Sequence, residues 1–431
     1  MTILVSGAGI AGLSFALTCH QIGVTVKLFE QVEEIRPLGV GINLQPHAIR
    51  ELMELGLEAE FDGIGIRTRE LAFFSKHGRP IWSEPRGFDA GYDWPQLSVH
   101  RGKLQLMLMN AVRERIGPDV IQTGWKATGY SQDDAGVTLH LTDRQGNTRT
   151  EQGSMLIAAD GIHSAIRSQM NPNEGPPVWG GAVLWRSTSL AKPFLGGATM
   201  AMVGHEWQKF VTYPISEADP ETGLAEINWV AEIKKEPDAL WNREDWNRPG
   251  NIADFLPAFE SWKYDWLDAP ALIKAANHIY EYPMVDRDPL DNWRDRRVTL
   301  MGDAAHPMYP IGSNGASQAI LDARILGKHL VTEGLSENAL IAYEAERRPA
   351  TSKIVVANRG NGPDQIMQLV EEKCQGMFDK IDDVMSQQEL HDHAARYKAL
   401  AGFDLETLNS RPPLISTSDI VRGHSLEAQN A

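Results

Sequence analysis

Three glycines near the start of the chain have the spacing that binds two nucleotides joined through phosphates. Gly7, Gly9 and Gly12 follow the pattern G-x-G-x-x-G, with an apolar run at 3–5 before them and a helical pattern at 13–17 after them. In such a turn the first glycine permits the bend, the second lets the backbone approach a pyrophosphate, and the third lets the helix pack on its strand. The pattern predicts a dinucleotide site; the alternative is a purely structural glycine turn.

A carboxylate follows at the position that would bind a ribose. A second apolar strand, 24–29, ends in Glu30, and a carboxylate there accepts hydrogen bonds from the hydroxyls of an adenosine ribose. The next loop, 36–46, carries Gly39 and Gly41, which predicts flexible backbone close to a flat ligand. The alternatives are a solvated strand end for Glu30 and an ordinary loop for 36–46.

Two further charged residues lie at the starts of predicted helices. Arg101 falls in the first turn of an apolar-faced helix, where a cation opposes the helix dipole, so an anion is expected nearby unless the arginine is simply solvated. Asp160 follows the apolar strand 155–159. It is well placed as the N-cap of a short helix, and capping alone would account for it.

A second ligand-facing edge is predicted far along the chain. The apolar strand 298–301 runs into GlyAspAlaAlaHis at 302–306, and a proline-containing loop then leads to a helix starting near Ala316. The backbone N–H groups of Asn314 and Gly315 would face an anionic or electron-rich group at that helix start.

Composition limits the partners. The net charge of -16 disfavours nucleic acid and anionic membranes, because the field of the protein repels phosphates. Cys19 and Cys374 are too few for a disulfide framework, and no ligand cluster with metal spacing occurs. No apolar run approaches the ~18 residues of a membrane helix, and the glycine-broken opening lacks the basic start of a signal peptide. A reducing cytoplasm is expected.

The middle of the chain has a different sequence pattern. From about 176 to 282, Trp and Tyr alternate within β-like runs, which predicts an antiparallel sheet. The segment 236–259 is expected to leave this sheet as a helix and loop, and the chain after 336 to be helical with a loosely ordered end. Trp185, Tyr213, Trp229 and, from the later loop, Pro310 are the candidates for a pocket, although aromatic residues are more often found in a core.

Three motifs in this order resemble the class A flavoprotein aromatic hydroxylases, of the salicylate and para-hydroxybenzoate hydroxylase type. They are the glycine pattern at 7–12, AspGly at 160–161 and GlyAspAlaAlaHis at 302–306. The resemblance covers about 2–359. The stretches 36–46, 82–87, 282–289 and 308–322 are similar to the phenazine monooxygenases, of the kind that forms pyocyanin, which suggests the subfamily without fixing the substrate.

The resemblance implies an α/β fold with a discontinuous Rossmann-like FAD-binding domain (1–70, 99–175 and 283–335). A mainly antiparallel β-sheet substrate domain (71–98 and 176–282) is inserted in it, and C-terminal helices follow (336–431). The interface of the two domains is the natural pocket. The implied FAD-binding residues are Gly7, Gly9, Ala11, Gly12, Glu30, Gln31, Val40, Gly41, Arg101, Asp160, Asp303, Pro310, Gly312, Asn314 and Gly315.

The implied activity is hydroxylation of an aromatic or N-heteroaromatic, phenazine-like acid by FAD, NAD(P)H and O2 through a flavin C4a-hydroperoxide, with or without decarboxylation. Only one glycine fingerprint occurs, so NAD(P)H is expected to bind transiently. No catalytic base is named, because the cofactor carries the chemistry, and His306 is expected to be structural. The alternatives are a flavin oxidase or dehydrogenase, and a non-catalytic binding protein. A monomer or homodimer is expected.

Overall fold

A mainly parallel sheet carries both predicted ligand-facing edges. Its strand order is β21-β22-β12-β1-β2-β8, and all neighbours pair in parallel except β21 with β22. The central strands β1, β12 and β22 are apolar and buried on both faces, as parallel strands are, which confirms the strands predicted to precede the three motifs. The strands are β1 (Thr2–Ser6), β2 (Thr25–Glu30), β8 (Ile121–Thr123), β12 (Met155–Ala158), β21 (Arg294–Asp295) and β22 (Val298–Leu300).

The helix after the first glycine turn lies in the centre of this half of the molecule. Helix α1 (Ile10–Gln21) is buried from Ile10 to Cys19, and it packs against β2, α3 (Arg101–Ile116) and α7 (Gly315–Glu333). A helix enclosed on several sides is apolar all round rather than on one stripe. Its packing against α7 therefore joins the first motif to the region of the last one.

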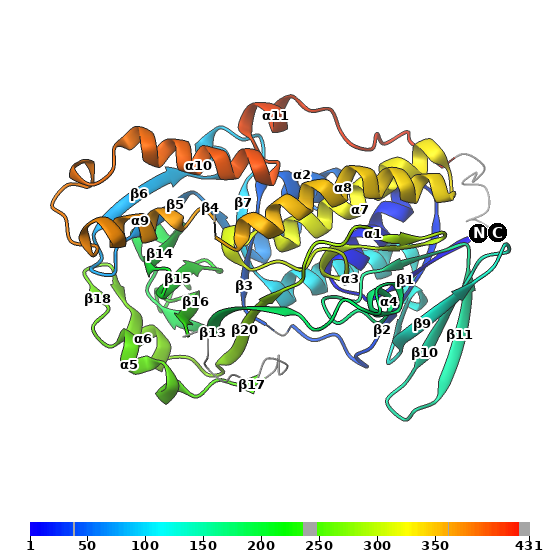
Figure 1. Ribbon diagram of the computed structural model, residues 1–431, viewed down its shortest axis with the longest axis horizontal. Coiled ribbons are helices and arrows are strands. Elements are labelled where there is room, and N and C mark those ends of the chain that lie inside the picture. Colours follow the sequence, from blue (N-terminus) through cyan, green and yellow to red (C-terminus); the bar gives the residue numbers. More distant parts are fainter. Residues whose placement is uncertain (38, 236–247, 361, 422–431) are drawn as a thin grey trace.

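A second, eight-stranded sheet forms the other end of the elongated molecule (Figure 1). Only β14 and β5 pair in parallel, and the other neighbours are antiparallel, so the predicted mainly antiparallel sheet is confirmed. In spatial order the strands are β17 (Arg248–Pro249), β20 (Tyr280–Asp286), β13 (Val178–Ala191), β16 (Ala225–Lys234), β15 (Gln208–Pro214), β14 (Thr199–His205), β5 (Glu70–Phe74) and β6 (Pro80–Pro85).

The two faces of this sheet have different neighbours. One face, with Trp185 and Trp229, forms an apolar core with α5 (Leu256–Phe259) and α6 (Ala269–Lys274). The other face, with Met202 and Tyr213, packs partly against α9 (Gln365–Cys374). Side chains alternate between the faces of a strand, so neighbouring residues such as Trp185 and Arg186 serve different surroundings.

The remaining elements connect and cover the two sheets. The C-terminal helices lie along the molecule beside both of them (Figure 1), which confirms a helical C-terminal region. These elements are β3 (Gly41–Leu44), β4 (Gly65–Thr68) and β7 (Gln96–His100); β9 (Lys126–Gln132), β10 (Val137–Thr142) and β11 (Thr148–Gly153); β18 (Lys263–Tyr264) and β19 (Leu267–Asp268); and helices α2 (Pro46–Glu54), α4 (Ala165–Met170), α8 (Glu337–Asn358), α10 (Gln387–Ala401) and α11 (Leu405–Ser410).

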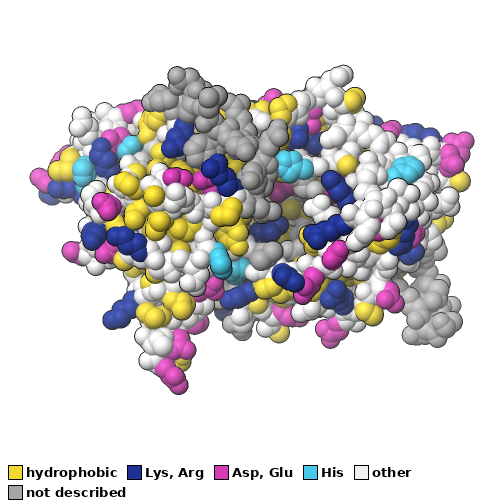
Figure 2. Space-filling view, turned by 90° about the horizontal axis from the view of Figure 1, so that it is seen from below, with side chains coloured by type: hydrophobic (Ala, Val, Ile, Leu, Met, Phe, Trp, Pro, Cys, Tyr) yellow, Lys and Arg dark blue, Asp and Glu magenta, His cyan; other side chains and the backbone are white. Residues whose placement is uncertain are grey.

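The structure describes residues 1–37, 39–235, 248–360 and 362–421. The first half of the predicted excursion at 236–259 and the last part of the predicted loose end therefore lie outside the described residues. Seen from below, hydrophobic side chains gather on the half of the face that belongs to the eight-stranded sheet (Figure 2). Within the described ranges, no helix is both long and apolar enough to cross a membrane.

Candidate functional site

The three glycines of the first turn have three different environments. Gly7 has φ +100, and a Cβ there would lie 2.3 Å from the carbonyl oxygen of Ala159. A Cβ on Gly12 would lie 2.1 Å from the carbonyl oxygen of Gly7, whereas a Cβ on Gly9 would meet nothing within 4 Å. Gly7 and Gly12 are therefore required by the fold itself, while Gly9 faces open space in a cavity.

That cavity, here called the nucleotide cavity, has a volume of about 410 Å³. The carboxylate of Glu30 in its wall is held by two backbone amides, Ala8 N at 2.8 Å and Val32 N at 3.1 Å. Gln31 beside it is exposed. The predicted residues that line this cavity are Gly7, Gly9, Glu30, Gln31, Arg101 and Asp160.

Asp160 carries an unused acceptor into the same cavity. Among the described residues its Oδ1 has no hydrogen-bond partner although the atom is buried, and burial raises the pKa of its carboxyl to about 6, against hydrogen bonds from Ser164 and Ala165 that lower it. The expectation that Asp160 caps the short helix is wrong: the Oγ of Ser164 accepts from Arg167 N at 2.9 Å and caps α4. The prediction had placed the start of that helix one turn too early.

Asp160→Asn should stabilise the ligand-free protein at pH 8 by about 1–3 kcal/mol. The folded state holds the Asp160 proton up to about pH 6, whereas the unfolded chain releases it near pH 4, so the penalty is absent in acid and grows as the pH rises through this window. Thermal unfolding of the ligand-free wild type and variant at pH 4 and pH 8 measures it. An equal shift at both pH values would contradict the buried, unpaired carboxylate.

The first and last motifs meet in space. A Cβ on Gly302 would lie 3.0 Å from the Cβ of Ala11, and Met301 N donates to Ala158 O at 2.9 Å. Arg167 donates from Nη1 to the carbonyl oxygens of Ala304 at 2.9 Å and Ala305 at 2.8 Å. The expected convergence of the distant motifs on one region is therefore present.

Asp303 is the acidic member of the last motif. Its side chain is exposed, yet the protein packed around it raises the pKa of its carboxyl, while His306 and Arg101 act in the opposite direction. Arg101, itself in the wall of the nucleotide cavity, is thus near enough to act on Asp303 electrostatically. The nucleotide cavity and the second edge share one electrostatic environment.

His306 belongs to a buried network, as the sequence predicts for a structural histidine. Its Nε2 lies 2.5 Å from Asp322 Oδ2, and Arg347 Nε donates to Asp322 Oδ1 at 2.7 Å. The backbone N–H of Gly302 also donates to Asp322. The network fixes the turn that presents Asp303.

A second, smaller cavity of about 60 Å³, here called the inner cavity, lies between the eight-stranded sheet and the loop at 310–313. Tyr213 and Pro310 line it, as does Gly312. Trp185 and Trp229 do not: both are fully buried in the core on the opposite face of the sheet. Their selection as pocket residues is wrong because the side chains that reach the cavity alternate with them along the strands.

The inner cavity contains a cation that sequence reasoning missed. Arg186 Nη2 donates to the carbonyl oxygen of Gly41 at 3.0 Å, and its buried Nε has no partner among the described residues. Burial lowers the pKa of the guanidinium, with the nearby Tyr213 and Tyr282 acting in the opposite direction. The alternation of side chains along β13 could have revealed this cation: Arg186 directly follows the core residue Trp185, so its side chain must lie on the opposite face of the sheet.

The other predicted loop residues belong to the segments around Gly41 and Gly312, which contact Arg186 and the inner cavity. Gly41 N donates to Asn228 Oδ1 at 2.7 Å, and Val40 and Asn314 are buried. A Cβ on Gly312 would lie 1.8 Å from the hydroxyl of Tyr397 in α10, so this glycine is also needed for packing. Gly315 begins helix α7.

A parallel sheet with a glycine turn, a second motif at its edge and an attached antiparallel sheet define a class of flavin-binding protein. The model of the FAD binding domain family matches residues 1–246 and 277–358, and the chain belongs to this family. Among its relatives is the phenazine 1,6-dicarboxylic acid hydroxylase PhzS of Lysobacter antibioticus, 43% identical over 361 residues, 83% of this chain and 89% of the relative. The 3-hydroxybenzoate 6-hydroxylase of Polaromonas naphthalenivorans is 28% identical over 370 residues, 84% of this chain and 87% of the relative.

Solved structures share the fold. Klebsiella pneumoniae HpxO complexed with FAD and uric acid matches with a TM-score of 0.70 at 22% identity, covering 96% of this chain and 97% of that chain. A salicylate hydroxylase substrate complex matches with a TM-score of 0.68 at 22% identity, covering 96% and 99%. The predicted α/β fold with an FAD-binding domain is thus confirmed, and the named relatives are FAD-dependent monooxygenases that act on aromatic acids.

The residues of the nucleotide cavity fit FAD. The open space at Gly9 admits a diphosphate close to the backbone, and the unpaired oxygen of Asp160 can accept a hydrogen bond from a ligand. Arg101 offers a cation beside both. This combination of free backbone, acceptor and cation matches the chemistry of a dinucleotide.

Asp303→Ala should weaken FAD retention at least about tenfold, roughly 1.4 kcal/mol, and disturb folding less. The side chain is exposed in the ligand-free structure, so its removal leaves no core cavity. Flavin fluorescence released on dilution measures retention, and the melting profile of the ligand-free variant measures folding. Asp291→Ala, which removes another exposed carboxylate, is the control; tight flavin in the Asp303 variant would contradict the role.

Proposed function

We propose that this protein uses NAD(P)H and O2 to hydroxylate an aromatic or N-heteroaromatic monocyclic or fused-ring acid, with a phenazine acid as the first candidate. The observation that carries the proposal is a pair of cavities connected through one loop: Arg101 of the nucleotide cavity donates its backbone N–H to Val40 O at 3.0 Å, and Arg186 of the inner cavity donates to Gly41 O at 3.0 Å. The name of the 43% identical relative supports the substrate class.

Each cavity has a separate task. Bound FAD supplies the redox chemistry, accepting a hydride from NAD(P)H and activating O2 for transfer of a hydroxyl group. Glu30 orients the adenosine end, Arg101 neutralises the diphosphate, and Asp303 holds the ribityl side. On the loops around Gly41 and Gly312, the residues that would bound the ring system are Val40, Gly41, Pro310, Gly312, Asn314 and Gly315.

The inner cavity orients the substrate and excludes water. Met200, Met202 and Val211 provide apolar wall, which holds a flat ring without competing hydrogen bonds. Arg186 receives the carboxylate of the acid, which supplies the anion that this partly buried guanidinium lacks. A local cation is required, because the overall charge of -16 repels anions.

Purification of the protein with its flavin and a screen of NAD(P)H oxidation against phenazine, salicylate, hydroxybenzoate and quinoline acids tests this function. At least one acid should accelerate oxidation and gain one oxygen atom from O2. Substrate oxidation with peroxide but no oxygen insertion would instead favour a flavin oxidase or dehydrogenase. No accelerated NAD(P)H oxidation with any acid would favour a non-catalytic binding protein.

Further parts of the proposal concern organisation and location. We assign 1–70, 99–175 and 283–335 to the FAD-binding domain, 71–98 and 176–282 to the substrate domain, and 336–431 to the C-terminal region. Cys19 and Cys374 are both free thiols, which supports a reducing cytoplasm. The assembly is proposed to be a monomer or homodimer, and NAD(P)H to bind transiently.

A further inference from the structure

The register of the eight-stranded sheet fixes the positions of the charged side chains on the inner cavity. Arg186 of β13 pairs with Val230 of β16, and Glu232 of β16 pairs with Lys209 of β15. Arg186 and Lys209 therefore lie on the same face of the sheet, two strands apart and offset by two residues along the strand. This places their Cα atoms about 12 Å from each other. The two cations stand at different ends of one surface.

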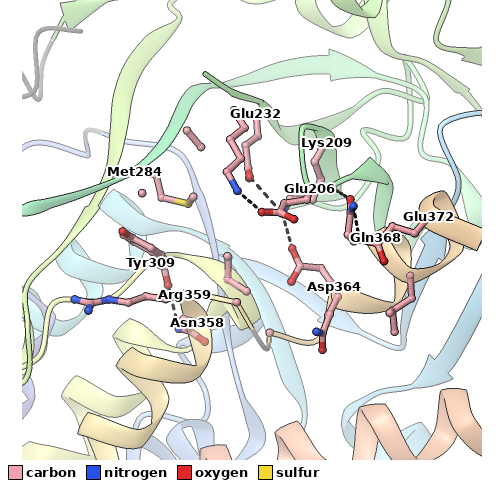
Figure 3. Close-up of a pocket in the computed structure, with 18 residues that line it drawn as sticks. Glu206, Lys209, Glu232, Met284, Tyr309, Asn358, Arg359, Asp364, Gln368 and Glu372 are labelled. Carbon is pink, nitrogen blue, oxygen red and sulfur yellow. Dashed lines mark hydrogen bonds and ion pairs between the residues drawn. The ribbon is translucent and has the colours of Figure 1, made fainter. Parts of the chain in front are cut away.

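The end at Lys209 is a buried cluster of three charges, here called the ion cluster. Lys209 Nζ lies 3.4 Å from Glu232 Oε1 and also contacts Asp364 Oδ2. Lys209 and Glu232 are 5% and 6% exposed, so the cluster holds one amino group and two carboxyl groups with little water. Burial and the neighbouring Asp364 raise the pKa of Glu232, while Lys209 acts in the opposite direction; the cluster carries its excess negative charge when Glu232 is ionised. Figure 3 shows the three side chains converging from β15, β16 and the segment that precedes α9.

The ion cluster stands between the inner cavity and a larger one of about 400 Å³, here called the outer cavity. Lys209, Glu232 and Asp364 line both cavities. The inner cavity has a volume of only about 60 Å³, so a fused-ring substrate must extend beyond it, past the cluster or toward the flavin side. The charge of the cluster therefore bears on whatever edge of the ring comes near it.

Neighbouring cations do not cancel the excess carboxylate. In the outer cavity Lys234 is paired with Glu206, and Arg359 is paired with Asp286 at 2.7 Å and with Asp288. At the far end of the inner cavity the charge is opposite: Arg186 has no carboxylate within 4 Å among the described residues. At one end of the inner cavity, Arg186 has no carboxylate partner within the described part of the chain. At the other end, the ion cluster has two carboxyl groups for one ammonium group.

We propose that the ion cluster of Lys209, Glu232 and Asp364 determines substrate specificity by directing an aromatic acid to bind with its carboxylate at Arg186 and an uncharged or hydrogen-bond-donating edge at the cluster. It thereby selects monocarboxylates over dicarboxylates that carry the second carboxylate on the opposite edge. This inference rests on the proposed function, because it deepens the substrate class of the same site.

The physical basis is repulsion between like charges with little solvent. A second carboxylate beside the cluster would be a third anion facing a single ammonium, and such juxtapositions are strongly unfavourable where water is excluded. We expect the dissociation constant of the dicarboxylate to be at least about tenfold larger than that of the monocarboxylate, which corresponds to about 1.4 kcal/mol. A hydroxyl or ring N–H at the same place would instead donate to a carboxylate oxygen.

Titration of the FAD-loaded protein with phenazine-1-carboxylate and with phenazine-1,6-dicarboxylate, followed by the flavin absorbance spectrum, measures the two dissociation constants. The wild type should bind the monocarboxylate at least about tenfold more tightly. Glu232→Gln removes the excess charge with little change of shape, and it should bring the ratio close to one, mainly by tightening dicarboxylate binding. A wild-type preference for the dicarboxylate, or an unchanged ratio in the variant, would overturn the proposal.

Glu372→Gln is the matched control. It removes the same charge from the exposed wall of the outer cavity, where Glu372 accepts a hydrogen bond from Gln368, and it should change the ratio less than about twofold because it leaves the ion cluster and the Lys234–Glu206 pair intact. Asp364→Asn removes one charge from the cluster by another route and must act like Glu232→Gln; it replaces that variant if Glu232→Gln does not fold.

Failure of the inference and failure of the proposed function give different results. If either acid accelerates NAD(P)H oxidation but the binding ratio does not respond to Glu232→Gln, the function stands and the specificity role is wrong. If both acids bind with the expected ratio and neither accelerates NAD(P)H oxidation, the binding preference stands and the hydroxylase function is wrong.

Discussion

Gly9→Ala should abolish tight FAD binding while the ligand-free protein keeps its fold. A Cβ at this position meets nothing within 4 Å in the ligand-free structure, so the methyl group adds no strain there. The same methyl group would occupy the space through which a diphosphate approaches the backbone. We expect at least about a tenfold, and up to about a hundredfold, loss of FAD affinity, about 1.4–2.8 kcal/mol.

Gly12→Ala is the informative counterpart. Its Cβ would lie 2.1 Å from the carbonyl oxygen of Gly7, and backbone atoms in a packed turn cannot move aside cheaply. Overpacking of this kind costs about 1–3 kcal/mol or more, so this variant should lower the melting temperature even without flavin. Calorimetry of the ligand-free proteins and flavin titration separate the two effects; equal melting losses in both variants would contradict the assignment of Gly9 to the ligand.

Arg186→Gln should raise the KM or dissociation constant for aromatic acids at least about 30-fold, roughly 2 kcal/mol. The guanidinium has no carboxylate partner within 4 Å among the described residues and a buried Nε without an acceptor. Removing a partly buried cation that has no carboxylate partner takes away a desolvation penalty, so the melting temperature of the FAD-loaded protein should stay equal or rise. Loss of binding would then come without loss of stability.

Steady-state kinetics and flavin-perturbation titrations measure the effect of Arg186→Gln. Arg186→Lys should recover part of the affinity, because a lysine keeps the charge but cannot form two parallel hydrogen bonds. Arg69→Gln, which removes an exposed arginine paired with Asp89, should leave binding unchanged. An Arg186→Gln variant with wild-type affinity for every acid would show that the carboxylate is bound elsewhere.

The sequence was most informative where local chemistry and topology agree. The glycine spacing at 7–12 predicts a strand before it and a helix after it. The structure explains two of these glycines, because a Cβ on Gly7 or Gly12 would collide with backbone atoms. The apolar runs at 155–159 and 298–301 predict buried strands, because strands buried on both faces are apolar throughout. Their parallel pairing is known only from the structure.

The sequence was least informative where a choice depends on which face is buried. Large aromatic residues drew attention to Trp185 and Trp229, but both faces of the second sheet are covered, so aromatic content does not distinguish a core from a pocket. The residues next in sequence, Arg186 after Trp185 and Val230 after Trp229, reach the inner cavity instead. The prediction of the residue that caps α4 was wrong for a similar reason. Asp160 and Ser164 are both good capping residues, and only the path of the backbone decides between them.

The strand order of the parallel sheet also has a consequence for biosynthesis. Strand β1 pairs on one side with β2 but on the other with β12, and β12 in turn pairs with β22. Translation at about 5–20 residues per second therefore delivers the last of these strands about 15–60 seconds after the first. Until the ribosome has released residue 300, the nascent chain exposes an incomplete sheet edge, and we expect flavin capture to be a late event that follows synthesis of both halves.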